Sequence, residues 1–188
     1  MMWQSVVSDW LSLGFRWLHI VSAVAWIGSS FYFIHLDLSL KPADDLPEGV
    51  QGNAWQVHGG GFYRIVKYLV APKAMPDELT WFKWEAYTTW LSGIALMVVV
   101  YYLEADLFLI DKAHFDLTPL QAAAFSAGSL ALAWVLYDVA CKCGLRHELP
   151  LALGGYLFLV ALTYAFTHVL SGRGALNQIG AIIGTIMV

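Results

Sequence analysis

The chain has 188 residues, of which 59% are hydrophobic and only 13% are charged. Soluble domains carry about a quarter charged residues, so this composition excludes an ordinary soluble domain and favours a protein that faces lipid. The net charge of −4 argues against nucleic acid as a partner. Cys141 and Cys143 form neither a CxxC nor a CxxCH motif, which excludes a zinc ribbon and a covalently attached c-type haem in this chain.

Four segments are apolar over a length that can cross a bilayer, because a hydrocarbon core of about 30 Å needs about 20 helical residues. They cover residues 11–38, 81–103, 120–141 and 149–170. A fifth apolar segment begins near Ile179, and we expect the domain to continue beyond Val188. The sequence therefore predicts an all-α fold. Residues 1–188 would form one polytopic transmembrane helix bundle, with four full spans and the start of a fifth.

Residues 41–80 form the one long polar connection between the predicted spans. The first part of this loop is rich in residues that favour turns. The second part, AWQVHGGGFYRIVKYLVAP, mixes aromatic and basic residues. Such a mixture suits a helix that lies at the membrane surface, and we predict an interfacial helix after Gly61.

Basic residues in the loops predict the orientation of the bundle, because cytoplasmic loops of membrane proteins are enriched in Lys and Arg. The second loop is acidic. The first and third loops hold most of the bases, namely Lys41, Arg64, Lys67, Lys73, Lys142 and Arg146. We therefore expect the loop at 41–80 in the cytoplasm and the N-terminus outside.

Two histidines, His19 and His168, lie within the first and fourth predicted spans. Ionisable residues inside a membrane span are costly and are candidates for function. The predicted orientation places both in the outer half of the bilayer, where two imidazoles could hold a b-type haem. Arg16 and Arg173 lie close to them in sequence and could pair with the haem propionates. The alternative is that each histidine only hydrogen-bonds a neighbouring helix.

A second group of ionisable residues is expected near the cytoplasmic side. Its members are His35, Asp37, His58, Arg64, Glu85 and Asp138. Such a group could relay protons or bind a polar substrate. The simpler interpretation is that acids at helix ends pair with loop bases, and we favour it for Asp138.

Three stretches of the chain resemble a known family. RWLHIVSAVAWIGSSFYFIHLDLSL, WQVHGGGFYRIVKYLVAP and LTWFKWEAYTTWLSG are similar to the N-terminal membrane domain of bacterial membrane-bound urate oxidases, the urate hydroxylase family. The resemblance implies a multi-pass domain in the bacterial inner membrane, commonly followed by a cytochrome c domain outside the membrane. It also implies oxidation of urate to 5-hydroxyisourate, with the electrons passed to cytochrome c or the respiratory chain.

For that reaction, Arg64 is expected to hold the urate anion, and Tyr63 and Trp84 to stack on its rings. His58 or Glu85 would take up a proton. Haem b would accept electrons, and a further haem would belong to a cytochrome c domain or partner. Two other functions stay open: a haem b electron-transfer subunit without its own substrate site, and a non-enzymatic membrane transporter or assembly factor.

Overall fold

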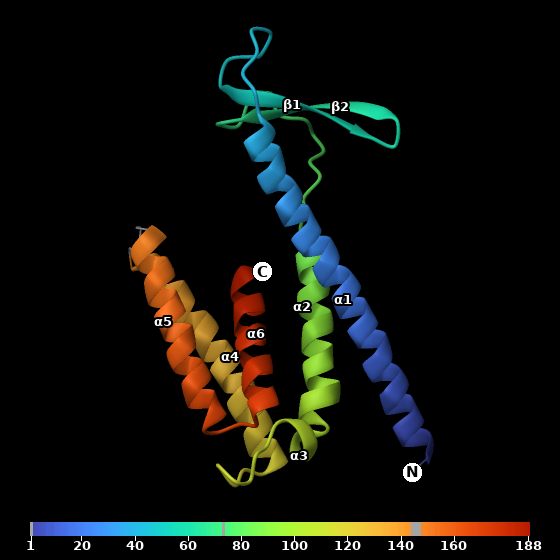
Figure 1. Cartoon of the computed structure of the whole chain (residues 1–188), viewed down its shortest axis with the longest axis vertical. Helices are drawn as coiled ribbons and strands as arrows, with labels where there is room; N and C mark the ends of the chain where they lie inside the picture. Colours follow the sequence, from blue (N-terminus) through green and yellow to red (C-terminus); the bar gives the residue numbers. More distant parts are fainter. Residues whose placement is uncertain (1, 73, 144–147) are drawn as a thin grey trace. The chain divides into compact units, whose positions relative to one another are not determined.

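The computed structural model describes residues 2–72, 74–143 and 148–188. Lys73 and Arg146, two of the bases used to predict the orientation, lie outside the described residues. The chain forms two compact units (Figure 1). The bundle unit combines Met1–Ser22 with Ala86–Val188, and the hairpin unit is Ala23–Glu85.

Helices make up most of the described chain. They are α1 (Met2–Ser39), α2 (Trp84–Leu96), the π-helix η1 (Met97–Tyr102), α3 (Ala105–Phe108), α4 (Pro119–Lys142), α5 (Glu148–Thr167) and α6 (Gly172–Met187). Of these described helices, three are long and apolar enough to cross a membrane, over Val6–Ser39, Pro119–Lys142 and Leu149–Thr167. Three of the four predicted spans are thereby confirmed as helices of sufficient length.

The remaining two predicted segments differ from the expectation. The segment at 81–103 is divided between α2 and η1, which follows α2 without a break, and it stays a prediction as a span. The last helix begins at Gly172 and not near Ile179. Ser171 caps this helix, because its hydroxyl accepts a hydrogen bond from the Gly174 N–H at 3.0 Å. The same hydroxyl donates to the Phe108 carbonyl oxygen at 2.6 Å, which ties the start of α6 to α3.

A buried polar network joins the helices of the bundle unit. α6 packs against both α4 and α5. From α6, the Gln178 amide donates to the Ser126 carbonyl oxygen at 2.8 Å and to the Ser129 hydroxyl at 3.0 Å, both on α4. The Ser126 hydroxyl donates to Gln178 Oε1 and lies 3.1 Å from the Tyr102 hydroxyl of η1. Since Ser126 and Gln178 are almost fully buried, these bonds satisfy groups that would otherwise be left without a partner.

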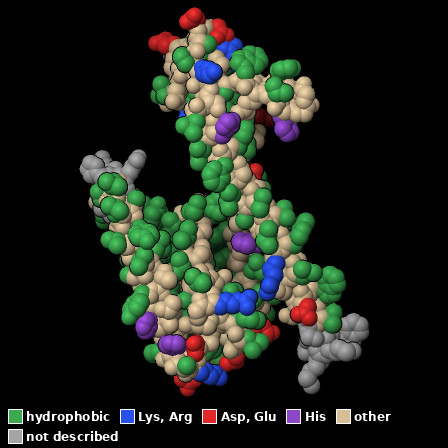
Figure 2. All heavy atoms as spheres, in the orientation of Figure 1, with side chains coloured by type: hydrophobic (Ala, Val, Ile, Leu, Met, Phe, Trp, Pro, Cys, Tyr) green, Lys and Arg blue, Asp and Glu red, His purple; other side chains and the backbone are tan. Residues whose placement is uncertain are grey.

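Side-chain types are distributed in each unit as expected for a membrane protein. Figure 2 shows hydrophobic side chains along the helices of the bundle unit, with charged side chains gathered at its α3 end. The acidic residues of this end include Glu104, Asp106, Asp111 and Asp116. In the hairpin unit, charged side chains gather around the sheet. The apolar helix surfaces are suited to lipid, and the charged ends to water.

The hairpin unit contains the one sheet of the described chain. Strands β1 (Val50–His58) and β2 (Gly61–Tyr68) pair antiparallel, and they run across the direction of α1 in Figure 1. Gly59 and Gly60 connect them with φ angles of 56° and 80°, as a type I′ turn requires. The interfacial helix predicted after Gly61 is therefore wrong. Consecutive glycines favour a tight hairpin turn over a helix start, and the flanking residues pair across the strands.

Three contacts hold the hairpin to the end of α1. Lys41 and Asn53 exchange two backbone hydrogen bonds of 2.8 and 2.9 Å. Lys67 of β2 forms an ion pair with Asp37 of α1 at 2.7 Å. The Tyr32 hydroxyl of α1 donates to Gln56 Oε1 of β1 at 2.6 Å. The last two turns of α1 and the hairpin therefore form one structural unit.

We predict that Gln178→Leu lowers the free energy of unfolding of the detergent-solubilised protein by about 1–3 kcal/mol, because it removes the hydrogen bonds of Gln178 to Ser126 and Ser129 from the network. The double variant Gln178→Leu with Ser126→Ala should recover part of this loss, since both members of one hydrogen bond are then apolar. Denaturant titration of the variants measures both effects. An unchanged free energy of unfolding in Gln178→Leu would contradict a stabilising network.

Candidate functional site

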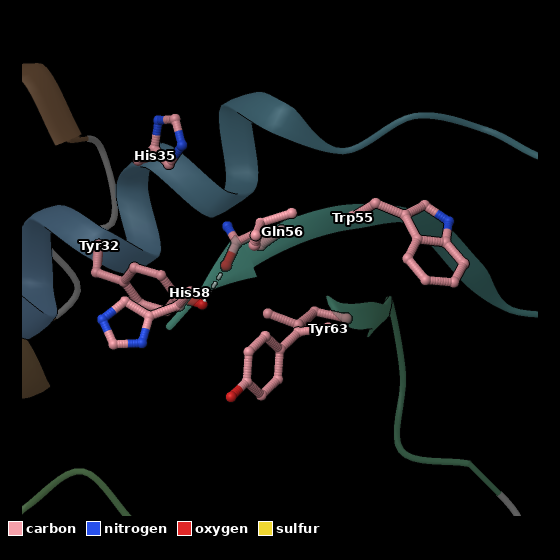
Figure 3. Close-up of a pocket in the computed structure, with 8 residues that line it drawn as sticks. Tyr32, His35, Trp55, Gln56, His58 and Tyr63 are labelled. Atoms are coloured by element: carbon pink, nitrogen blue, oxygen red, sulfur yellow. Dashed lines mark hydrogen bonds between the residues drawn. The ribbon is translucent and has the colours of Figure 1, made fainter. Parts of the chain in front are cut away.

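A pocket lies between the end of α1 and the hairpin (Figure 3). Its volume is about 610 Å³, within the range of about 300–1,000 Å³ typical of small-molecule sites. The residues that line it are mainly aromatic or able to hydrogen-bond: Tyr32, His35, Trp55, Gln56, Val57, His58, Tyr63 and Ile65. None of these lining residues is Asp, Glu, Lys or Arg. The pocket is therefore suited to a flat molecule that is recognised by stacking and by neutral hydrogen-bonding groups.

The register of the hairpin brings the pocket residues together. Gln56 lies opposite Tyr63, and His58 lies opposite Gly61 beside the turn. Cross-strand partners share one face of a sheet, so the Gln56 amide and the Tyr63 ring lie on the same side. From α1, Tyr32 reaches this side and bonds Gln56 (Figure 3). Two elements distant in sequence thus supply one set of polar groups.

Two of the five predicted substrate-site residues, His58 and Tyr63, line this pocket. Trp84 and Glu85 stand at the start of α2 and are not among its lining residues. Lys83 Nζ lies 5.8 Å from the centre of the Trp84 ring. Glu85 is in the first turn of α2, where a carboxylate stabilises a helix through its dipole.

Arg64 is held away from the pocket by a bidentate ion pair. Its guanidinium donates to both carboxylate oxygens of Asp45, at 2.8 and 2.7 Å, and lies 5.7 Å from the centre of the Trp55 ring. The hydrogen bond with Arg64 lowers the pKa of Asp45 from its ordinary value, and the same bond raises the pKa of Arg64. Both groups are therefore charged at neutral pH, and the Arg64 charge is already compensated before any anion binds.

The acids at the other helix ends pair with nearby bases. Asp138 accepts from Lys142 one turn further along α4, at 2.6 Å, and Asp37 pairs with Lys67. These pairs agree with the simpler interpretation of the acidic residues.

His19 is fixed against α2 inside the bundle unit. Its Nδ1 lies 3.0 Å from the Thr89 carbonyl oxygen and 3.2 Å from the Ser92 hydroxyl. A Cβ atom added at Gly93 would stand 3.0 Å from His19 Cε1, so the imidazole occupies space that only glycine leaves open. An Nδ1–H group that donates to a carbonyl leaves Nε2 as the basic nitrogen, which is the usual arrangement of a metal-binding histidine.

His168 has a similar arrangement in a different place. It follows α5, and its Nδ1 lies 2.8 Å from the Tyr164 carbonyl oxygen one turn earlier. Its described contacts are with its own segment, whereas those of His19 are with α2. No hydrogen bond in the described part of the chain joins the two histidines, and their pairing stays a prediction.

The two arginines predicted to hold propionates have other partners. Arg16 Nε donates to the Ser12 hydroxyl of α1 at 3.1 Å. The Arg173 guanidinium lies over two aromatic rings, 4.6 Å from the centre of Phe108 and 6.0 Å from that of Tyr101. Arg173 is therefore already part of the packing between α6 and α3.

Sequence reasoning missed Tyr32, Gln56 and Trp55 as pocket residues. The sequence contains a feature that places Gln56 on the face of Tyr63, because two runs of residues flank a Gly-Gly pair, which is a hairpin pattern. That pattern fixes which residues of the two strands share a face, and it puts Trp55 on the opposite face, across from Arg64. Nothing comparable identifies Tyr32, whose role depends on how α1 meets the hairpin.

The family model described as "Urate oxidase N-terminal" matches residues 5–188. No curated protein and no solved structure matches the chain. The match covers both the hairpin pocket and the two histidines of the bundle unit.

We expect Gly93→Ala to displace the His19 ring and weaken its bonds to Thr89 and Ser92, lowering the free energy of unfolding in detergent by about 1 kcal/mol. Gly128→Ala is the matched control, because a Cβ atom at this α4 glycine meets nothing within 4 Å. There, alanine should be neutral or stabilising by up to about 1 kcal/mol. Equal stabilisation by both substitutions would show that the His19 ring does not depend on Gly93.

Proposed function

Because the chain belongs to the urate oxidase N-terminal family, we propose that it is part of a membrane-bound oxidoreductase that oxidises urate, and that urate binds in the hairpin pocket. The observation that carries this proposal is the pocket itself, where His58 and Tyr63 lie with Gln56 and Trp55 in one cavity. Family membership supports a function related to urate. The pocket supports a substrate site within this chain.

The chemistry of the pocket matches the chemistry of urate. Urate is a flat purine with carbonyl oxygens and ring N–H groups along its edges, and it is mostly a monoanion at neutral pH. The Tyr63 ring offers a surface for stacking, and the Gln56 amide and the histidines offer hydrogen-bond donors. Since no carboxylate is among the lining residues, nothing in the lining repels the anion.

The proposed reaction converts urate and water into 5-hydroxyisourate, two electrons and two protons. The oxygen of water forms a bond to C5 of the purine as an O–H bond of the water breaks, and two electrons leave the purine. His58 is the proposed base that takes a proton from the attacking water, because a neutral imidazole can accept a proton near pH 7. Its place beside the turn, at the edge of the pocket, leaves it within reach of both substrate and solvent. Glu85 lies outside the lining, so His58 is the better candidate of the two predicted bases.

Haem b is proposed as the first electron acceptor, with His19 and His168 as its candidate ligands. Each histidine has Nδ1 next to a backbone carbonyl oxygen, which favours the tautomer whose Nε2 can bind iron. These contacts support each histidine separately as a candidate ligand, and the binding of one haem by both is part of the proposal. When bound, haem would accept the electrons of urate singly and pass them to cytochrome c or another respiratory carrier.

The bilayer in question is proposed to be the bacterial inner membrane, with the N-terminus outside and the hairpin unit in the cytoplasm. The hairpin unit carries Lys41, Arg64 and Lys67, which favours this orientation. Urate would then enter from the cytoplasm, and its electrons would leave toward the outer side.

We predict that His58→Gln lowers kcat for urate-dependent reduction of cytochrome c by about 100-fold or more, the size of a lost general base, while KM changes little. The measurement uses the detergent-purified, haem-supplied protein and follows cytochrome c absorbance. His114→Gln is the control, since His114 lies in the acidic loop of the bundle unit, paired with Asp111.

Wild-type kcat in His58→Gln would remove this residue from the reaction. A haem signal that dithionite produces but urate does not would favour the alternative of an electron-transfer subunit without its own substrate site. Absence of any haem signal in folded, haem-supplied protein would contradict the ligand role of both histidines.

A further inference from the structure

We propose that Tyr32 and Gln56 form the specificity determinant of the hairpin pocket, by presenting the Gln56 amide N–H groups to a carbonyl oxygen of an oxidised purine. Purines with carbonyl groups on the pyrimidine ring would then bind in preference to purines with amino groups there. This inference rests on the proposed function, and it identifies the Gln56 amide as the group that distinguishes urate from other purines.

The hydrogen bond between the two side chains sets the orientation of the amide. The Tyr32 hydroxyl donates to Gln56 Oε1 at 2.6 Å, a short distance for such a bond. A carboxamide has one oxygen that accepts and one nitrogen that donates. With Oε1 turned toward Tyr32, Nε2 is turned away from it and offers its two N–H groups. The bond joins a side chain of α1 to a side chain of β1, so both elements contribute to the orientation of the amide.

The neighbouring residues turn this amide into a recognition site. Gln56 lies opposite Tyr63 across the hairpin, and both line the pocket. A planar ligand stacked on the Tyr63 ring would bring its edge toward the Gln56 side chain on the same face of the sheet. The sheet thus offers a surface for the purine face and a donor for the purine edge.

Selection follows from the pairing of donors with acceptors. A carbonyl oxygen accepts a hydrogen bond from the Gln56 amide, whereas an exocyclic amino group is a donor and leaves the amide without a partner. Gln56 is half-buried, and a donor that a bound ligand covers without offering an acceptor is unfavourable. Sites that hydrogen-bond a substrate group discriminate between substrates more sharply than apolar ones. The lack of a charged residue in the lining leaves neutral groups such as this amide to make the distinction.

The test compares three variants with a matched control. Gln56→Glu keeps an oxygen that can accept from Tyr32 but replaces the amide donor with an anion. Gln56→Met removes the hydrogen bond and keeps the shape. Tyr32→Phe frees the amide to rotate. Gln51→Glu is the control, because Gln51 is an exposed β1 residue outside the lining and receives the same change of charge.

The readouts are KM and kcat for urate, and competitive inhibition by xanthine and by 2,6-diaminopurine, which carry carbonyl and amino groups at the same two positions. We expect KM to rise about 10-fold in Gln56→Met, because a neutral hydrogen bond to urate is lost. In Gln56→Glu we expect a rise of about 100-fold, because the new carboxylate also repels the urate anion. Tyr32→Phe should raise KM about fivefold, with kcat nearly unchanged. The wild-type preference for xanthine over 2,6-diaminopurine should shrink in Gln56→Met and reverse in Gln56→Glu.

The outcomes separate the inference from the function on which it rests. Unchanged KM and an unchanged inhibitor preference in all three variants, with wild-type protein that oxidises urate, would overturn the inference alone. If wild-type protein neither oxidises nor binds urate, both fail. A purely structural role of the Tyr32–Gln56 bond would lower thermal stability and kcat in Tyr32→Phe without changing the preference between the two inhibitors, and that result would also overturn the inference.

Discussion

The hairpin pocket depends on the backbone conformation of two glycines. Gly59 and Gly60 have positive φ angles, which L side chains adopt only with strain. The two-residue turn that they form matches the twist of paired strands and sets the register in which Gln56 lies opposite Tyr63. A slip of one residue would move one of these side chains to the other face of the sheet. The proposed stacking surface and the proposed donor are therefore brought together by a turn that contains neither of them.

A two-stranded hairpin is marginally stable by itself, and the contacts with α1 supply additional stabilisation. The Lys41–Asn53 backbone pair, the Asp37–Lys67 ion pair and the Tyr32–Gln56 hydrogen bond join both strands to the end of a helix that is long enough to cross a membrane. A ligand that touches both α1 and the hairpin would stabilise this arrangement further, since binding to the folded form shifts the equilibrium toward it. Substrate binding and order in the hairpin are thus coupled in the proposed account.

Hydropathy was sufficient to predict the long helices, because the length of an apolar segment follows directly from the thickness of the bilayer. It was insufficient where local hydrogen bonding decides the structure. The π-helical turns of η1 divide the second apolar segment without changing its composition. After Gly61, the mixed aromatic and basic residues suit an interfacial helix by composition, whereas the Gly-Gly pair before them favours the hairpin that forms.

Residue type predicts some of the pocket residues, and the alternation of side chains along the strands explains which predicted residues lie outside the pocket. His58 and Tyr63 were identified from residue type and lie in one pocket. Arg64 follows Tyr63 in sequence, yet successive strand residues point to opposite faces, and Arg64 pairs with Asp45. The contact of His19 with Gly93 could not be predicted, because it depends on how α1 packs against α2.

Hydrogen–deuterium exchange with and without urate locates the bound substrate on the chain. If urate binds in the hairpin pocket, exchange should be slower in β1 and β2 and at the end of α1 when urate is present at a saturating concentration. Exchange in α4, α5 and α6 should stay unchanged. Protection confined to the bundle unit, or no protection in the hairpin at a concentration that supports turnover, would contradict a urate site in the hairpin pocket.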